Sequence, residues 1–389
     1  MKNSISFQVE TIIYSVKING DIALCSATKK FDKVNLSTSQ IRLTSKEIKD
    51  CLAGLEPDIR RSIDKVFENI SYFHAKEFQN IKKTWKININ GIVSGQRVTS
   101  IEKAGIYVPG GRYSYPSSVL MTAIPAKIAG VKYLAVATPP GNINPAVIYA
   151  CQKCGVDEIF RVGGAQAIAA FAFGTKIVPK VDIIVGPGNA YVTEAKRQVF
   201  GYVGIDSIAG PSEVAIIADA SAEAETVFAD LMAQAEHDSN AKVYLFSTKK
   251  ELVAKICKMI PGSNKKQFFM HVCGMYQAIA LVNRIAPEHL ELMVKNPELL
   301  LSKIHNAGAV FLGPYAPAVL GDYIAGPSHV LPTAGSARFS SGLSCATFMK
   351  RSSFINCSRN AFTAVSGHIK QLSLAEGLVY HNKSAWIRE

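Results

Sequence analysis

The chain has 389 residues, of which 48% are hydrophobic and 19% are charged, and its formal net charge is +13. This composition is typical of a globular protein. At roughly 150 residues per domain, the length predicts two or three domains and excludes a single small module. Lysines and arginines occur as singles and pairs, such as Lys249-Lys250, without a basic run or interleaved aromatic residues, so the charge does not favour nucleic-acid binding.

The N-terminus contains no apolar core of a signal peptide, and no stretch approaches the roughly 18 apolar residues of a membrane span. We therefore expect a cytoplasmic protein without a membrane partner. Eight scattered cysteines favour reduced thiols over a disulfide framework. Cys151 and Cys154 form one CxxC motif without a second pair, which favours a helix surface over a redox or zinc site.

The first hundred residues are Lys-rich, with helix-like stretches at 45–55 and 57–82. From Ala104 onward, short apolar runs alternate with amphipathic patterns, as is typical of parallel α/β sheets. The alternation predicts strands at 131–138, 156–162, 181–185, 213–219 and 242–246, and helices at 144–154, 164–173, 189–199, 221–238 and 250–260. The expected fold is two incomplete Rossmann-like α/β domains in tandem, with small N- and C-terminal extensions.

Three glycine-rich stretches fall at strand-to-helix turns, although none matches the GxGxxG fingerprint of dinucleotide-binding domains. They are 109–111, 163–166 and 186–189. Backbone N–H groups and the helix dipole can receive a phosphate at such turns, but glycine is also the usual turn residue. Either interpretation holds for one cluster alone; three within a hundred residues favour anion binding.

Side chains of the type that bind metals are found in the last two thirds of the chain. Gln234 and His237 are three residues apart on a predicted helix, so both can reach one point in space. With Asp322 and His381 they form an N/O ligand set suited to zinc that does chemistry. Glutamine is an uncommon ligand and no compact HExxH motif is present, so a structural amide at Gln234 remains the alternative.

Glu288 and His289 follow a proline and precede the apolar run 290–294, which predicts a turn that leads into a strand. A histidine there can act as a general base near neutral pH, and the neighbouring carboxylate can activate water. The alternative is a surface glutamate beside a half-buried histidine. Asp322, next to Gly321, has an equally plain interpretation as an Asx turn.

Eight phrases, in order across nearly the whole chain, resemble the histidinol dehydrogenase family. They are Tyr107-Val-Pro-Gly-Gly111, Val162-Gly-Gly-Ala-Gln-Ala-Ile168, Val185-Gly-Pro-Gly-Asn-Ala190, Ala209-Gly-Pro-Ser-Glu213, Gln234-Ala-Glu-His237, Pro287-Glu-His-Leu290, Gly321-Asp-Tyr323 and Ser328-His-Val-Leu-Pro-Thr333. The resemblance implies a zinc-dependent, NAD-linked oxidation of L-histidinol to L-histidine through an enzyme-held aldehyde. This reaction is the last step of histidine biosynthesis.

The same resemblance implies a role for each residue of the site. One zinc ion per subunit would be held by Gln234, His237, Asp322 and His381. His289 would remove the alcohol proton and Glu288 would help to activate water. The substrate pocket would comprise Ser212, Gln234, His237, His289, Asp322, His329, Glu376 and His381, and the NAD contacts would be Tyr107, Gln166 and Asn189.

The family is a homodimer in which the C-terminal arm of one subunit completes the site of the other, which implies that His381 and Glu376 act in the partner's site. On this basis we expect residues 1–106 to pack with 212–335 as the zinc-binding catalytic domain. Residues 107–211 would bind NAD and 336–389 would form the dimerisation arm.

Two other functions remain open from the sequence. A zinc hydrolase on a related α/β framework would use Glu288 as its base and would have no need for the glycine-rich turns. A basic nucleic-acid-binding module would require a basic stripe, and the chain has none.

Overall fold

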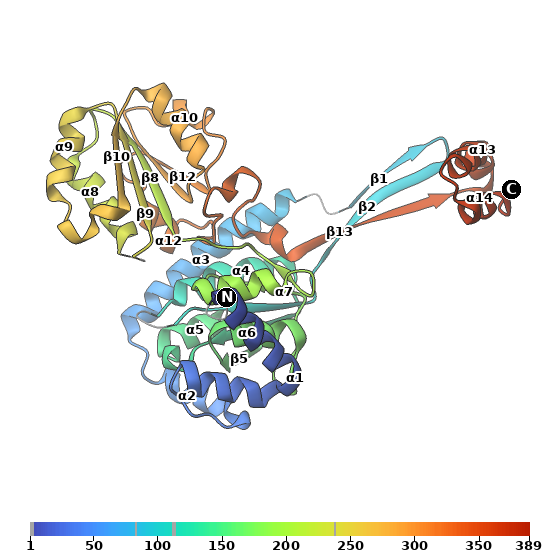
Figure 1. Cartoon of the computed structure of the whole chain (residues 1–389), viewed down its shortest axis with the longest axis horizontal. Coiled ribbons are helices and arrows are strands. Elements are labelled where there is room, and N and C mark those ends of the chain that lie inside the picture. The colour runs from blue at the N-terminus through green and yellow to red at the C-terminus, as the bar shows by residue number, and fades with distance from the viewer. Residues whose placement is uncertain (1–3, 82–83, 111–113, 237–238) are drawn as a thin grey trace. The chain divides into compact units, whose positions relative to one another are not determined.

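A computed structural model describes the chain except for residues 1–3, 82–83, 111–113 and 237–238. The chain divides into two compact units (Figure 1). Unit 1 comprises Met1–Phe78 and Ile101–Phe348, and unit 2 comprises Gln79–Ser100 and Met349–Glu389. Unit 1 contains two five-stranded sheets, and unit 2 contains one three-stranded sheet.

The first sheet of unit 1 is parallel throughout, in the order β5-β4-β3-β6-β7. Its strands are β3 (Lys103–Tyr107), β4 (Tyr133–Thr138), β5 (Glu158–Arg161), β6 (Ile183–Val185) and β7 (Gly204–Ile205). Its helices are α4 (Pro116–Ala129), α5 (Pro145–Lys153), α6 (Gly164–Phe173) and α7 (Ala190–Val199), with the 3₁₀ helix η2 (Pro140–Asn142). Counted within the domain, the order is 3-2-1-4-5, which is the Rossmann order without its sixth strand.

The second sheet repeats this topology in the order β10-β9-β8-β11-β12, again all parallel. Its strands are β8 (Glu213–Ala218), β9 (Lys242–Ser247), β10 (Phe268–Val272), β11 (His289–Met293) and β12 (Ala309–Leu312). Its helices are α8 (Ala224–Ala235), α9 (Lys250–Met259), α10 (Met275–Ile285), α11 (Glu298–Leu301) and α12 (Ala318–Tyr323), with η3 (Gly262–Gln267). Two 3₁₀ helices follow in the chain, η4 (Ser336–Arg338) and η5 (Cys345–Phe348), and η5 packs on α4. The predicted pair of incomplete Rossmann-like domains is confirmed.

The N-terminal part of unit 1 was not predicted in full. Helix α1 (Ile5–Phe31) packs on α6 and α7 and buries Val9, Val16 and Leu24 there. It is followed by η1 (Thr38–Gln40), α2 (Ser45–Leu52) and α3 (Pro57–Asn80). The two helix-like stretches expected from the sequence correspond to α2 and α3.

Unit 2 joins an N-terminal hairpin to the C-terminus of the chain. Strands β1 (Thr84–Ile89) and β2 (Ile92–Ser100) form the hairpin, and β13 (Met349–Cys357) pairs antiparallel with β2. Asn90 and Gly91 both have positive φ, which suits the tight turn between twisted strands. Helices α13 (Arg359–Ala375) and α14 (Val379–Trp386) follow β13 and pack on each other (Figure 1).

The CxxC pair requires one correction. Cys151 and Cys154 lie at the end of α5, as expected, but both are buried, so the prediction of a helix surface is wrong. Both thiols are free. Among the described helices, none is long and apolar enough to cross a bilayer.

Candidate active site

The Glu288-His289 pair lies where the chain enters β11, and both residues are buried. The predicted turn into a strand is confirmed, and the alternative of a surface glutamate is wrong. His289 Nδ1 lies 3.2 Å from the backbone oxygen of Glu213. A carbonyl oxygen can only accept, so Nδ1 carries the proton and Nε2 is the basic nitrogen. Nε2 lies 3.8 Å from Oδ1 of Asp322.

Glu288 is held in an environment that disfavours its charge. Burial raises its pKa to about 8, and the negative charges of Asp322 and Glu213 act in the same direction. Two hydrogen bonds oppose this rise, one from the backbone N–H of Glu213 at 3.0 Å and one from the side chain of Ser212. A carboxylate of raised pKa is a stronger base than a surface one once it is ionised.

Gln234 and Asp322 line the same small hollow, which has a volume of about 10 Å³. Gln234, near the end of α8, is buried, and its Nε2 has no partner among the described residues. Asp322 comes from α12. The structure therefore brings two of the expected metal ligands together, with His289 beside Asp322. The prediction for His237 lies outside the described residues.

Sequence reasoning missed two acidic side chains in this hollow, Asp230 and Glu291. Glu291 is 1% exposed, and its Oε1 accepts the backbone N–H of Ala318 at the start of α12. Burial raises the pKa of Glu291, and the negative charge of Asp230 raises it further. A signal was available, because Glu291 is the one charged residue within the apolar run 290–294.

The other residues expected in the substrate pocket come from different parts of the chain. His329 Nδ1 lies 3.0 Å from the backbone oxygen of Asp322. Glu376 ends α13 and His381 lies on α14, so both belong to unit 2, where they are exposed.

Tyr107, Gln166 and Asn189 all line one cavity of about 460 Å³ at the carboxyl ends of the strands of the first sheet. Parallel α/β sheets bind ligands at this edge, at the point where the strand order reverses. Here that point is at β3, because β4 and β5 lie on one side of it and β6 and β7 lie on the other. The Tyr107 hydroxyl accepts the backbone N–H of Gly164 at 3.0 Å. Burial raises the pKa of Tyr107 to about 12, so its phenol stays protonated and able to donate.

The turn after β6 is fixed by a buried ion pair. Lys196 pairs with Asp206, and its Nζ also donates to the backbone oxygen of Gly186 at 3.0 Å. Asp206 accepts the N–H of the same glycine at 2.7 Å. Gly186 has a φ of 112°, and a Cβ there would lie 2.2 Å from the backbone oxygen of Tyr107. Only glycine allows this close approach, which holds the turn before Asn189 in place.

Helix α1 contributes Ile12 and Phe31 to the same cavity, and Asp32, which caps the end of this helix, also lines it. None of the three was singled out from the sequence. Oδ2 of Asp32 is buried without a hydrogen-bond partner among the described residues, and burial raises the pKa of this carboxyl. A carboxylate beside two apolar side chains suits a nucleoside, whose hydroxyls donate while its base packs on the apolar surface.

Comparisons with known proteins agree over the whole chain. The family model of histidinol dehydrogenase matches residues 1–389. The histidinol dehydrogenase of Clostridium acetobutylicum is 46% identical over 98% of this chain and 91% of its own length. That of Bacillus thuringiensis is 44% identical over 100% and 93%. A crystal structure of histidinol dehydrogenase from Elizabethkingia anophelis superimposes with a TM-score of 0.91 at 37% identity, covering 99% of this chain and 92% of that one. The chain therefore belongs to the histidinol dehydrogenase family of oxidoreductases.

Proposed function

We propose that the chain oxidises L-histidinol through an aldehyde to L-histidine, with NAD as the acceptor and zinc as the bound metal. The family membership supports the reaction. The observation that carries the chemistry is His289, whose Nδ1–H is committed to the Glu213 carbonyl while its basic Nε2 lies beside Asp322. A general base of this kind is what an alcohol needs to lose its proton.

Zinc would be held by Gln234, His237, Asp322 and His381. The donor set fits, because its atoms are nitrogen and oxygen, and the buried Gln234, which would bind through its amide oxygen, lines the same hollow as Asp322. When bound, zinc would supply a redox-inert positive charge that orients the substrate.

NAD would occupy the cavity lined by Tyr107, Gln166 and Asn189, whose glycine-rich turns suit a pyrophosphate. When bound, NAD would accept the two hydrides in succession. Neutral Tyr107 would donate a hydrogen bond to NAD. The side-chain oxygen of Asn189 caps α7, since its Oδ1 accepts the N–H groups of Tyr191 and Val192.

The chain's own residues would then move the protons. Nε2 of His289 accepts the proton of the substrate hydroxyl as the alcohol becomes the aldehyde. Glu288, in its ionised form, accepts a proton from the water that adds to the aldehyde carbon. Ser212, His329 and Glu376 would contact the substrate and orient it between these two bases.

A homodimer would complete the site, with Glu376 and His381 of one subunit acting in the other. Unit 2 exposes many large apolar side chains, which is typical of a surface buried by another chain. They include Ile87, Ile89, Ile355, Leu372, Leu374, Val379, Tyr380, Trp386 and Ile387. Residues 336–389 would form the dimerisation arm, 107–211 the NAD-binding domain, and 212–335 the catalytic domain. Residues 1–106 were expected to pack with 212–335, but α1 packs on α6 and α7, and β2 pairs with β13. We further propose a cytoplasmic location.

The test is to measure NADH and histidine formed from L-histidinol by the purified protein, with and without a chelator. The expected result is two NADH per histidine, lost on chelation and restored by zinc. Turnover without NADH, or a fully zinc-loaded protein that neither binds NAD nor reduces it, would reject the proposal in favour of a zinc hydrolase with Glu288 as its base.

A further inference from the structure

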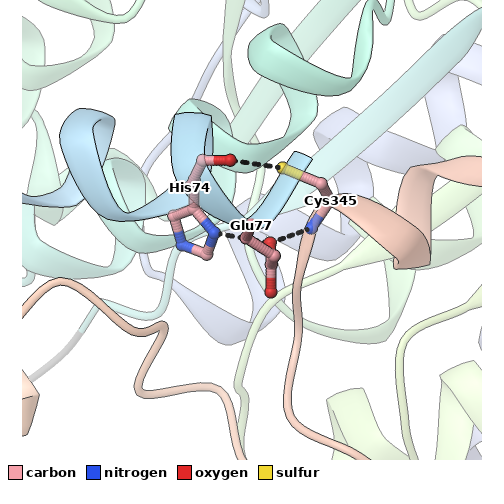
Figure 2. A group of neighbouring side chains, drawn as sticks. All are labelled: His74, Glu77 and Cys345. Carbon is pink, nitrogen blue, oxygen red and sulfur yellow. Dashed lines mark hydrogen bonds and ion pairs between the residues drawn. The ribbon is translucent and has the colours of Figure 1, made fainter. Parts of the chain in front are cut away.

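A second group of possible metal ligands, which shares no residue with the candidate active site, is formed by side chains of α3 and η5 (Figure 2). It consists of His74 and Glu77, one turn apart on α3, and Cys345, the first residue of η5. Within the described residues, this is the single group of three His, Cys, Asp or Glu side chains whose ligand atoms all lie within 4.8 Å of one another.

The three side chains are already held in position by their own contacts. His74 Nδ1 lies 2.9 Å from Oε2 of Glu77, and the same oxygen accepts the backbone N–H of Cys345 at 2.9 Å. The Cys345 thiol donates to the backbone oxygen of His74 at 3.6 Å. His74 and Cys345 are fully buried, while the Glu77 side chain is 27% exposed. Solvent therefore reaches the group along the carboxylate.

The donor set and its spacing suit zinc. Imidazole nitrogen, thiolate sulfur and carboxylate oxygen are its three common protein ligands, with bond lengths of about 2.0 to 2.3 Å. Tetrahedral geometry at those lengths separates the ligand atoms by roughly 3.4 to 3.8 Å. His74 Nδ1 and Glu77 Oε2 lie 2.9 Å apart, and all the ligand atoms of the group lie within 4.8 Å of one another, so small side-chain rotations would bring them to the tetrahedral separations.

We propose that His74, Glu77 and Cys345 bind a zinc ion with structural function, the fourth position being filled by water beside Glu77. The site differs in chemistry from the proposed catalytic one, whose ligand set contains no sulfur. The positions of the three ligands in the chain indicate what the ion would do. Three residues after Glu77 helix α3 ends and the chain continues to β1, and η5 leads directly into β13. The ion would tie together the two segments through which the chain leaves unit 1.

Binding releases one proton to solvent, because the thiol becomes a thiolate, and it also requires the hydrogen that Nδ1 of His74 donates to Glu77 to leave that nitrogen. The imidazole stays neutral if its proton moves to Nε2, which is buried and has no partner among the described residues. Burial raises the pKa of the Cys345 thiol, and the negative charge of Glu77 raises it further. The affinity for zinc should therefore increase with pH.

The experiment is to titrate the full-length, metal-free protein with cobalt(II) at several pH values and to record the near-ultraviolet spectrum. A thiolate-to-cobalt charge-transfer band reports a Cys ligand and is silent for an N/O site. The expected result is one band-forming equivalent per chain, which appears at lower cobalt concentration as pH rises and is removed by one equivalent of zinc. Absence of the band in the wild type at high pH would overturn the proposal.

Variants assign the band to this group. Cys345→Ser should abolish it, whereas Cys257→Ser, which changes an exposed thiol elsewhere, should leave it intact. His74→Asn removes a different ligand and keeps the thiol, and it should weaken cobalt binding by roughly 100-fold or more. This variant tests the site even if Cys345→Ser does not fold. A band that survives Cys345→Ser would reject the site. NADH formation by Cys345→Ser measures the dehydrogenase separately, so failure of one proposal leaves the other standing.

Discussion

The protonation state of each side chain proposed as catalytic is set by one or two neighbouring groups. His289 has a defined tautomer because its Nδ1 faces a backbone carbonyl. Glu288 has a raised pKa because it is buried, and the hydrogen bonds from Glu213 and Ser212 only partly offset this rise. Both contacts involve residues at the start of β8, which adjoins β11 in the sheet. A change at either side chain should therefore alter chemistry more than folding.

His289→Asn should lower kcat for the alcohol and for the aldehyde by about 10²- to 10⁴-fold, because asparagine keeps an N–H for the Glu213 carbonyl but has no basic nitrogen. Steady-state NADH formation from each substrate measures this, and zinc content should stay at the wild-type level. His271→Asn, at an exposed position on β10, is the matched control. Loss of zinc from the His289 variant would mean that this residue is a ligand.

Asp32→Asn should weaken NAD binding by about 10- to 100-fold, since a hydrogen bond from a sugar hydroxyl to a carboxylate contributes about 1.5 to 3 kcal/mol. The measurement is a calorimetric titration with NAD, which needs no turnover. Asp50→Asn removes the same charge from an exposed position and should have no effect. Equal affinities for the Asp32 variant and the wild type would place the nucleoside elsewhere in the cavity.

At the scale of elements, the two sheets share a topology but use opposite edges. The cavity proposed for NAD lies at the carboxyl ends of its strands, whereas Glu213 and His289 lie at the amino ends of β8 and β11. At the second edge, α8 and α12 both end close by, which brings Gln234 and Asp322 together. Glu291 holds α12 there through the N–H of Ala318.

Glu291→Gln should stabilise the protein at pH 8 by about 1 to 2 kcal/mol, and by less at pH 5. Burial raises the pKa of Glu291 in the folded state, so the wild type loses stability as pH rises above 4.5, where the unfolded carboxyl ionises. Glutamine keeps the acceptor for Ala318 and carries no charge. Urea unfolding of metal-free protein at both pH values measures the difference, with the exposed Glu298→Gln as control. A gain independent of pH would contradict this explanation.

Elements with a regular apolar pattern were predictable. Helix α6 has the predicted bounds, and β8 and β9 differ from theirs by one residue. Helix α1 was missed because exposed apolar residues such as Tyr14, Ile18 and Ile22 obscure its buried face. β13 was missed because most of its residues are exposed and it forms by pairing with a distant hairpin, which no local pattern encodes.

The candidate active site also has parts that the sequence predicts and parts that it does not. The Glu288-His289 turn has a local signal, and its entry into β11 was predicted. Three other features depend on contacts between segments far apart in the chain. They are the hydrogen bond that fixes His289, the acidic pair Asp230 and Glu291, and the part of α1 that lines the cavity proposed for NAD. The sequence identifies such residues by type but cannot show which partners surround them.

At the scale of the whole molecule, the proposed dimer predicts complementation between inactive variants. His289→Asn carries an intact arm, and His381→Ala carries an intact catalytic domain. If the arm acts in the partner's site, each mixed dimer has one complete site, and random reassociation of equal amounts should restore about a quarter of wild-type activity. The measurement is NADH formation after joint unfolding and refolding. No recovery, with dimers formed, would mean that each arm serves its own subunit.

The sheet of unit 2 also constrains how the protein is made. In it, Ser100 pairs with Met349, so β2 has no partner on that side until almost the entire chain has left the ribosome. Both Rossmann-like domains of unit 1 can form earlier, because their strands are contiguous in the chain. During synthesis, one edge of the hairpin β1-β2 keeps unpaired backbone N–H and C=O groups until β13 is made. A nascent chain that stalls before β13 would expose that edge to other chains.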